Sequence, residues 1–258
     1  MRSEGQRPLA GNSWATDTDL MRLDNPVLVR WEFASEERLA KRNAIFRALV
    51  EGDNPEDIAF AAVAEARPTR LLDVGCGPGE LTERFARELG VEVRAVDISP
   101  RMVELTRARG IDAELADAEE LPFADGEFDC VFAGWVLYHI PKLEQAIAEC
   151  ARVLRPGGRL VATTHSIENV SELWELIGCE EPRTPLSFDR SNGTTLLGRH
   201  FSTVEQRDLE AQLVFPDSES IRTFVASTID RAHYAAQVPE INEPFRATAR
   251  HTVFIAER

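Results

Sequence analysis

Between residues 70 and 164 the chain alternates short apolar runs with helical patterns, and its first run leads into three alternate glycines. The apolar runs are RLLDVGC (70–76), VEVRAVDI (91–98), IDAELAD (111–117), FDCVFAG (128–134) and GRLVATT (158–164). Helical patterns stand between them at 80–89, 100–109 and 142–154. Strands that alternate with helices form right-handed βαβ units and a parallel sheet. The sequence therefore predicts an α/β, doubly wound, Rossmann-like fold.

The segments on either side carry looser patterns. Residues 1–20 are polar and aperiodic, and they suggest a loose arm. A helix capped near Ser35 and a second helix over 55–66 are expected before the core. Beyond the core, the patterns indicate helices over 168–178 and 218–229 and strands over 204–215 and 251–257.

The sharpest motif is the turn Asp73-Val74-Gly75-Cys76-Gly77-Pro78-Gly79, between the first strand and the following helix. Glycine lacks a Cβ atom, so a ligand can approach the backbone closely at the sheet edge where doubly wound folds bind cofactors. Dinucleotide enzymes use the spacing G-x-G-x-x-G, whereas this turn reads G-x-G-x-G with Glu80 in place of the last glycine. Asp73 precedes the turn, where a carboxylate repels pyrophosphate and attracts an ammonium group.

Two further acidic residues follow neighbouring strands. Asp97 lies 22 residues after Gly75, where it can accept hydrogen bonds from ribose hydroxyls, as it also would in an NAD enzyme. Asp117, with the backbone amide of Ala118, can bind the exocyclic amine and a ring nitrogen of adenine. The ligand so described has a purine, a ribose with free hydroxyls, a cationic tail and no phosphate. S-adenosylmethionine meets all four conditions, whereas NAD carries a pyrophosphate.

Each of these features also has a purely structural explanation. The three glycines can serve only a tight strand-to-helix turn. Asp97 can cap the helix that follows, although Ser99 is better placed for that role, and Asp117 can be a solvated loop carboxylate. Cys76 has no base nearby in the sequence, so we interpret it as a small packing residue rather than a nucleophile.

Four segments, in order and spacing, resemble the class I S-adenosylmethionine-dependent methyltransferases of the small-molecule type. They are LLDVGCGPGELT (71–82), AVDIS (95–99), ADAEELPFADGEFDCVFAGWVLYHI (116–140) and RVLRPGGRLVATT (152–164). The resemblance covers about residues 70–165 and implies a seven-stranded sheet whose last strand is antiparallel. We therefore expect HTVFIAE (251–257) to be that last strand.

The resemblance also implies roles for single residues. The Asp73–Gly79 turn would wrap the methionine portion, Asp97 would hold the ribose, and Asp117 and Ala118 would bind the adenine. Ile98 and Met102 would pack on the base, although a methionine at such a position is more often a core residue. The residues assigned to the cofactor are Asp73, Gly75, Gly77, Gly79, Asp97, Ile98, Met102, Asp117, Ala118 and Gly134.

Helices that close over the cofactor are common at the N-terminus of this family, which makes Arg42 or Trp31 a candidate contact of the methionine carboxylate. We accordingly expect an N-terminal arm with lid helices (1–66) and a cofactor-binding core (67–165). The remainder (166–258) would supply small cap insertions for the substrate together with the C-terminal strands of the same sheet.

Methyl transfer from a sulfonium needs mainly alignment of the donor and the acceptor. A base must also remove a proton where the acceptor is a hydroxyl or an amine. His139 is the candidate catalytic residue, with His165 a weaker one, because both follow strand ends that face the expected cleft. The competing interpretation of His139 is a histidine at a helix start that is bonded to the backbone. Tyr138 would orient the substrate or simply pack.

Charge and composition restrict the partners. The chain has 29 basic and 44 acidic side chains, a net charge of −15, and this disfavours binding to a nucleic-acid backbone. No apolar stretch approaches a membrane span, and the N-terminus lacks the apolar run of a signal peptide. The four cysteines have neither zinc-ligand nor CxxC spacing, so we expect no metal site and a reducing cytoplasm. The oligomeric state is not predicted.

The remaining substrate class is a small-molecule acceptor that is methylated at nitrogen or oxygen. Specialised metabolism is one setting for such a reaction. Aromatic residues of the flanking segments can line its pocket or simply pack in the cap: Trp174, Phe188, Phe201, Phe224, His233, Tyr234 and Phe245. Two other functions stay open. One is a nicotinamide-dependent oxidoreductase, and the other is a catalytically silent binding module with the methyltransferase fold.

Overall fold

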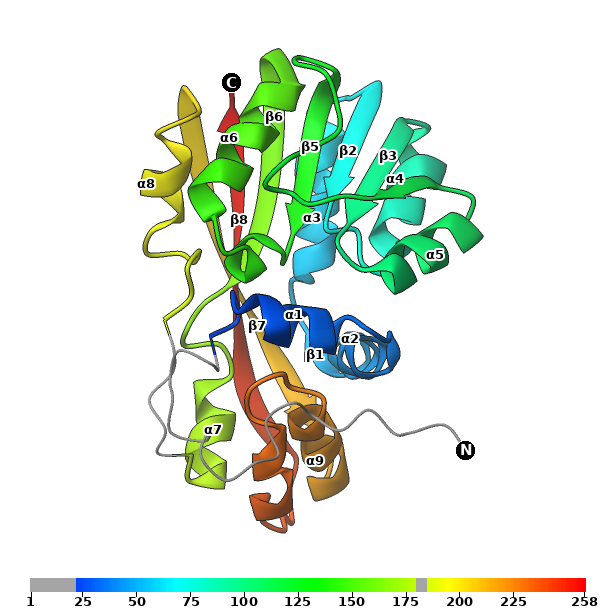
Figure 1. Cartoon of the computed structure of the whole chain (residues 1–258). Helices are drawn as coiled ribbons and strands as arrows, with labels where there is room; N and C mark the ends of the chain where they lie inside the picture. Colours follow the sequence, from blue (N-terminus) through cyan, green and yellow to red (C-terminus); the bar gives the residue numbers. More distant parts are fainter. Residues whose placement is uncertain (1–21, 180–184) are drawn as a thin grey trace, which may run out of the picture.

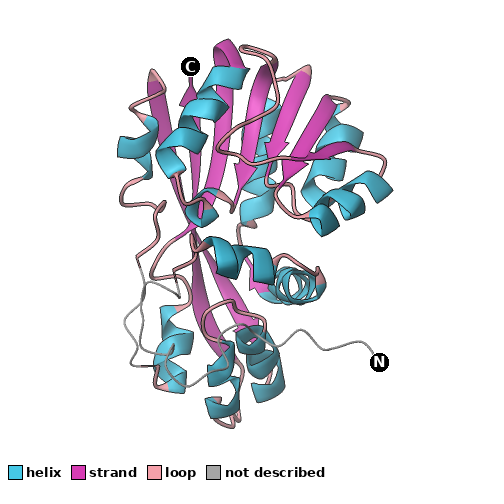
Figure 2. Ribbon diagram, viewed as in Figure 1, coloured by secondary structure: helices cyan, strands magenta, loops and turns pink. Residues whose placement is uncertain are grey.

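The computed structural model describes residues 22–179 and 185–258, and the predicted arm over 1–20 lies outside these ranges. Eight strands form one sheet in the order β1-β7-β8-β6-β5-β2-β3-β4, with helices on both of its faces (Figure 2). The strands are β1 (Val50–Glu51), β2 (Arg70–Val74), β3 (Glu92–Asp97), β4 (Asp112–Leu115), β5 (Phe128–Gly134), β6 (Leu154–His165), β7 (Thr203–Phe215) and β8 (Phe245–Glu257). The α/β, doubly wound prediction is confirmed.

The sheet has a parallel body and an antiparallel end. Strands β4, β3, β2, β5 and β6 run parallel, and β8 runs antiparallel to both of its neighbours, β6 and β7. The predicted antiparallel last strand is thus confirmed. The expected count of seven strands is one short, because the two-residue strand β1 adds an antiparallel edge beside β7.

Helices cover both faces of the parallel body. Helices α3 (Pro55–Glu65), α4 (Glu80–Leu89) and α5 (Pro100–Ala108) pack on the face that carries Leu71, Ala95 and Phe132. Helix α6 (Leu143–Val153) packs on the face that carries Val131 and Leu160, and α8 (Gly193–Leu197) lies on the same side against β7 and β8. Successive strand residues point to opposite faces, so the strands buried on both faces are nearly all apolar, as the sequence runs indicated.

Strands β7 and β8 continue past the rest of the sheet and build a second cluster (Figure 1). Their pairing covers thirteen residues of each strand, whereas β6 pairs only with 251–257 of β8. Helices α7 (Ser171–Ile177) and α9 (Ser218–Ala226) and the short helix η3 (Ala232–Gln237) pack on this extension. The prediction that β8 begins at 251 is wrong by six residues: the buried Ala247 and Ala249 alternate with polar neighbours and extend the strand.

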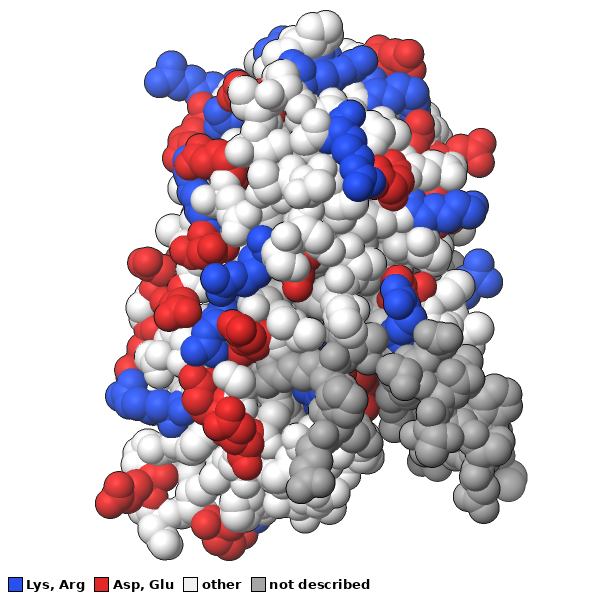
Figure 3. Space-filling model, turned by 90° about the vertical axis from the view of Figure 1, so that its left-hand side faces the viewer, with Lys and Arg blue, Asp and Glu red and all other residues white. Residues whose placement is uncertain are grey.

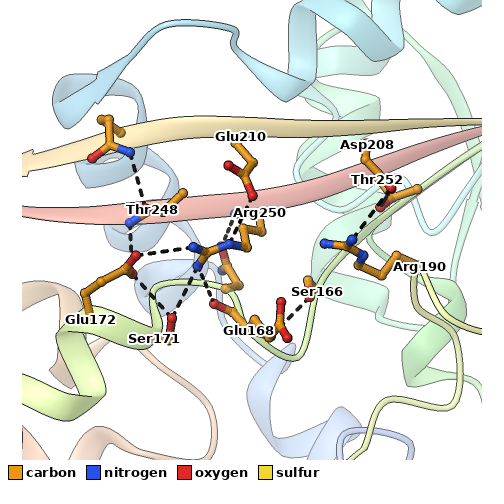
Figure 4. A network of polar contacts seen from close by, with 12 residues as sticks. Ser166, Glu168, Ser171, Glu172, Arg190, Asp208, Glu210, Thr248, Arg250 and Thr252 are labelled. Atoms are coloured by element: carbon orange, nitrogen blue, oxygen red, sulfur yellow. Dashed lines mark hydrogen bonds and ion pairs between the residues drawn. The ribbon is translucent and has the colours of Figure 1, made fainter.

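A polar network fastens α7 to the extended strands (Figure 4). The Arg250 guanidinium on β8 donates to Glu210 on β7, to Ser171 and Glu172 at the start of α7, and to the backbone oxygen of Glu168. Glu172 also accepts a hydrogen bond from the Thr248 backbone amide at 3.1 Å. This arrangement holds the pKa of Glu172 at about 2, although partial burial acts against the shift. The cluster is therefore continuous with the sheet.

Two N-terminal helices lie between the sheet and this cluster, below the carboxyl ends of β2, β3 and β5 (Figure 1). Helix α1 (Pro26–Glu32) has Asn25 as its N-cap and Pro26 at its first turn. Helix α2 (Glu37–Leu49) begins after Glu36 and has no side-chain cap, so the predicted cap at Ser35 is wrong. None of the residues of α2 is fully buried, as expected for a helix that covers an open cleft.

Candidate active site

A cleft of about 670 Å³ opens where the carboxyl ends of the parallel strands face α1, α2 and the lower cluster. Strand β2 contributes the glycine turn, β3 ends at Asp97, and β5 ends at Gly134. Of the ten predicted cofactor residues, eight line this cleft: Asp73, Gly75, Gly77, Asp97, Ile98, Asp117, Ala118 and Gly134. Gly79 and Met102 do not line it, and Met102 is fully buried at the start of α5.

The glycine turn is held by backbone hydrogen bonds to β3. The amides of Gly75 and Cys76 both donate to the Val96 carbonyl, at 2.8 and 3.1 Å. Gly75 has φ +73°, and a Cβ atom there would lie 2.4 Å from the Val136 side chain. A Cβ on Gly77, by contrast, would meet only Leu39, at 3.8 Å. Gly75 is therefore required by packing, whereas Gly77 leaves open backbone in the cleft.

Gly79 serves the turn rather than the cleft. It adopts φ +78° as the residue that precedes α4, and a Cβ atom there would lie 2.5 Å from the Thr106 hydroxyl. Thr106 in turn donates to the Gly77 carbonyl at 2.9 Å. The Cys76 thiol lies 3.5 Å from the same hydroxyl, and burial raises its pKa well above the ordinary value, so it stays a protonated packing group.

Asp97 ties the turn to the start of α5. One carboxylate oxygen accepts from the Gly77 amide at 2.9 Å and the other from the Ser99 amide at 2.8 Å. The side chain of Ser99, not that of Asp97, caps α5 by accepting from the Met102 amide. Burial raises the pKa of Asp97, but each carboxylate oxygen keeps a lone pair that can accept a hydrogen bond from a ligand.

Asp73 is the most buried acid of the cleft, with 2% of its surface exposed. Its carboxylate accepts a hydrogen bond from the Thr82 hydroxyl at 2.6 Å. Burial, together with the nearby Asp97, raises the pKa of Asp73 to about 7. A bound cation would favour the charged form of Asp73, so this end of the cleft is suited to a positively charged ligand group.

Asp117 and its neighbours form the outer wall next to β4. Asp117 is exposed and accepts a hydrogen bond from the Glu119 amide at 2.9 Å, which shapes the turn. Ile98, 42% exposed, lines the same cleft and offers an apolar surface that nothing covers among the described residues. A planar ring placed here would have an apolar face beside it and polar backbone at its edge.

His139 projects into the cleft from the short helix η2 (Leu137–His139). Its Nδ1 lies 2.8 Å from the carbonyl oxygen of Leu23. A carbonyl can only accept, so Nδ1 carries the proton and Nε2 keeps a free lone pair. Burial lowers the pKa of His139 to about 4, which keeps the ring neutral near pH 7. The backbone-bonded interpretation and the catalytic one are therefore compatible.

His251 is a residue that the sequence reasoning did not single out. It lies on β8 opposite the weaker candidate His165, and both line the cleft. The indole nitrogen of Trp135 donates to its Nδ1 at 3.2 Å, and its Nε2 is buried without a hydrogen-bond partner among residues 22–179 and 185–258. Burial lowers the pKa of His251 to about 4. The alternation of β8 at 245–250 could have placed it on the cleft side.

Some of the other candidate residues line the cleft and others do not. Arg42 lines the cleft, but it donates to the Ser227 carbonyl at 2.6 Å and to Glu32 at 3.3 Å, and Trp31 lies outside the lining. Of the seven flanking aromatics, Trp174 and Phe224 line the cleft, while Phe188 and Phe201 belong to the sheet core. The described residues include no group of three side chains placed to bind a metal ion.

The fold and the cleft together define a class: a doubly wound sheet with a glycine turn, acidic strand ends and an antiparallel last strand is the class I methyltransferase fold. Residues 72–162 match the family model of a methyltransferase domain. Recognition of the family from the sequence is thereby confirmed.

Two curated relatives and one solved structure illustrate the similarity. A malonyl-[acyl-carrier protein] O-methyltransferase of Enterobacter lignolyticus is 38% identical over 119 residues, 45% of this chain and 47% of that protein. A 27-O-demethylrifamycin SV methyltransferase of Amycolatopsis mediterranei is 46% identical over 99 residues, 35% of this chain and 36% of that protein. The matches thus span half or less of these relatives.

The crystal structure of the [4+2]-cyclase SpnF superposes with a TM-score of 0.55 at 22% identity, over 81% of this chain and 85% of that one. A likeness at this identity concerns the fold. It covers a larger part of the chain than residues 72–162.

Proposed function

We propose that the protein is an S-adenosylmethionine-dependent methyltransferase that acts on a small-molecule acceptor. The observation that carries the proposal is the convergence of Asp73, Asp97 and Asp117 with the open glycine backbone in one cleft. Three carboxylates to which no basic side chain of the described residues is bound repel a pyrophosphate and suit a ligand that combines hydroxyls, an amine and a positive charge. The same geometry argues against a nicotinamide cofactor.

The residues fit this cofactor one by one. The backbone of Gly77 and the carboxylate of Asp73 would hold the methionine portion, and the free lone pairs of Asp97 would accept from the ribose hydroxyls. Asp117 and Ala118 would bind the adenine edge, with Ile98 against its face. Met102 would support Ile98 from the core without touching the base, because its side chain is fully buried.

When bound, S-adenosylmethionine supplies a methyl group that is already activated by the positive sulfur. The protein must then align the acceptor and remove its proton. His139 would accept that proton at Nε2, because Nδ1 is committed to the Leu23 carbonyl. The low pKa of His139 makes it a weak base in the free protein, so its main contribution would be to orient an acceptor hydroxyl by a hydrogen bond.

The relatives favour oxygen as the methylated atom, since one of the two described above is named an O-methyltransferase and the other is named for a 27-O-demethyl substrate. The face drawn in Figure 3 carries interspersed acidic and basic side chains without a continuous basic stripe among its coloured residues, which supports a small molecule rather than a nucleic acid as the acceptor. No helix in the described ranges is long and apolar enough to cross a bilayer. All four cysteines are free thiols, which supports a reducing, cytoplasmic location.

The test is thermal unfolding with S-adenosylhomocysteine, with NADH as the control ligand. At about 100 times its dissociation constant, a ligand specific to the native state adds about 2.7 kcal/mol, a clear rise in the midpoint. Asp97→Asn should lose most of the rise, whereas Asp112→Asn, an exposed residue outside the cleft, should keep it. A rise with NADH alone would overturn the proposal. Binding of S-adenosylhomocysteine without turnover of any acceptor would indicate the silent module instead.

A further inference from the structure

The lower end of the cleft contains a buried arginine that the proposed cofactor does not use. Arg231 follows α9 and lines the cleft, with only 8% of its side chain exposed. Its guanidinium lies over the ring of Trp174, 5.1 Å from the centroid. Trp174 belongs to the cluster around α7, α9 and the extended strands, which places Arg231 away from the glycine turn.

The hydrogen-bonding capacity of Arg231 is unmet in the described part of the chain. Its one ion pair joins Nε to a carboxylate oxygen of Asp230 at 3.8 Å, which is longer than a hydrogen bond. A guanidinium has five N–H donors, and burying a cation without acceptors is costly. Arg42, the comparable arginine of the same cleft, is by contrast hydrogen-bonded to Ser227 and Glu32. Arg231 therefore has a geometry suited to an anionic ligand.

The walls around this arginine are apolar. They come from helices, strands and loops of the lower half of the molecule: Val170, Trp174, Leu213, Phe224 and Ile229. His251 adds a neutral ring on the wall formed by β8. A ligand that fills this end would bury a hydrophobic body and place one charged group on Arg231.

We propose that Arg231 binds an oxyanion of the acceptor, so that the substrate is an acid with a hydrophobic body, held by its charged end. This inference rests on the proposed function and names its substrate class. The planar fork of arginine matches both carboxylates and phosphates in a two-point contact. A carboxylate is favoured because Asp230, 3.8 Å from the guanidinium, opposes a second negative charge.

The charge distribution along the cleft agrees with this assignment. Asp73 and Asp97 lie at the cofactor end and favour positive groups, whereas Arg231 lies at the other end. An anionic acceptor would therefore be drawn to the end of the cleft that the cofactor leaves open. The reacting hydroxyl would be a different group of the same molecule, because an oxygen bound to a guanidinium is a poor nucleophile.

The test uses matched ligands that differ only in charge. Binding of 3-phenylpropionate, its neutral amide and phenyl phosphate would be measured by calorimetry on the whole protein, with and without saturating S-adenosylhomocysteine. We expect the carboxylate to bind at least tenfold more tightly than the amide and more tightly than the phosphate. Arg231→Met should remove the preference, and Arg231→Lys should keep part of it.

Arg222→Met is the matched control, because Arg222 lies on the outer side of α9, is paired with Glu219 and Glu240, and does not line the cleft. It should keep the full preference. Retention of the preference in Arg231→Met, or equal or undetectable binding of the acid and the amide to the wild type, would overturn the inference. A stronger preference for phenyl phosphate would overturn the choice of carboxylate.

The two proposals fail separately. Loss of S-adenosylhomocysteine binding in the wild type would refute the proposed function, whereas normal binding of it with no preference for the acid would refute only the role of Arg231. Arg231→Met should leave the affinity for S-adenosylhomocysteine within twofold. Its unfolding midpoint should not fall, since the variant removes a buried charge that lacks hydrogen bonds; a large fall would indicate a structural role.

Discussion

The indole nitrogen of Trp135 donates a hydrogen bond to Nδ1 of His251 across 3.2 Å, from the end of β5 to the middle of β8. Since Nδ1 accepts, His251 must carry its proton on Nε2. His139 in the same cleft has the opposite tautomer, because its Nδ1 donates to the Leu23 carbonyl. The cleft thus contains two neutral histidines, one with an acceptor at Nε2 and one with a donor.

The first prediction concerns these two protonation states. Burial lowers the pKa of both His139 and His251 to about 4, so both should remain neutral at pH 5.5, with opposite tautomers. Nitrogen-15 NMR of histidine-labelled protein distinguishes the two tautomers and the charged form. Trp135→Phe should raise the pKa of His251 by removing the donor to Nδ1. An unchanged pKa in that variant would refute the role of the indole.

The same shift has a consequence for stability. A histidine whose folded pKa lies below its unfolded value of about 6.5 binds fewer protons in the native state, so stability falls as the pH drops from about 6.5 to about 4. When the pH falls from 7.5 to 5, the unfolding free energy of His251→Gln should therefore rise by about 2 kcal/mol relative to that of the wild type. One pKa unit corresponds to about 1.4 kcal/mol. His200→Gln, outside the cleft, is the control in denaturant titrations at both pH values.

A second prediction concerns Asp73, whose pKa of about 7 results mainly from burial. A ligand with an ammonium group binds best when this carboxylate is charged. The affinity for S-adenosylhomocysteine should therefore rise as the pH increases from 6 to 8, and change by up to tenfold per pH unit below the pKa. Calorimetry across this range measures it. Asp73→Asn should bind weakly and without that pH dependence; a parallel dependence in the variant would assign it to another group.

Asp73→Asn should weaken ligand binding but increase the stability of the fold. A carboxyl with a raised folded pKa binds more protons in the native state, so it stabilises the fold least above that pKa. Asp73→Asn can keep the hydrogen bond from Thr82 without the buried charge. We expect it to unfold at higher denaturant concentration than wild type at pH 8, and the difference should shrink towards pH 5.

The parallel core was predictable from the sequence because its strands are buried on both faces. The run at 128–134 and the helix at 80–89 match β5 and α4 residue for residue. The Asp73–Gly79 turn was equally visible, since its glycines and acids lie close together in the chain. The residues at the cofactor end of the cleft could be predicted because they belong to one strand–turn–helix unit and to the strand ends beside it.

The lower half was less predictable because its pattern is interrupted by charged residues. Phe245-Arg246-Ala247-Thr248-Ala249-Arg250 alternates as a strand should, but its small alanines give a weak signal. Helix α1 had a clear start signal in Asn25-Pro26, an N-cap followed by proline at the first turn. Arg231 could not be found at all, because its burial depends on packing between α7 and the loop after α9.

A third prediction tests the packing of the glycine turn. Gly75→Ala should destabilise the protein by more than about 2 kcal/mol and weaken S-adenosylhomocysteine binding, since φ is +73° and the new Cβ would lie 2.4 Å from Val136. Gly90→Ala is the matched control, with φ +64° and open space around it. It should cost about 1 kcal/mol. Chemical denaturation gives both values.

The steric part of this effect can be isolated. Gly75→Ala combined with Val136→Ala removes the atoms that clash and should recover part of the lost stability relative to the sum of the two single variants. Strict additivity would show that backbone strain at Gly75, rather than contact with Val136, accounts for the cost.

The last prediction concerns the attachment of the N-terminal helices α1 and α2. Glu32 at the end of α1 is 3% exposed and lies 3.3 Å from both Arg38 and Arg42. The same arginines donate to the backbone oxygens of Thr228 and Ser227, just after α9, at 2.7 and 2.6 Å. One buried carboxylate therefore neutralises two side chains that join α2 to the lower cluster across the cleft.

Glu32→Gln should cost about 1–3 kcal/mol of unfolding free energy, because two partly buried guanidinium groups lose their counter-charge. The surface pair of Glu51 and Arg246 gives the control: Glu51→Gln should cost less than about 0.5 kcal/mol. If α1 and α2 act as a lid, loosening them should also release S-adenosylhomocysteine faster, so stopped-flow measurements should show a higher dissociation rate with a nearly unchanged association rate. An unchanged dissociation rate in a destabilised Glu32→Gln variant would mean that this carboxylate supports the fold without controlling access to the cleft.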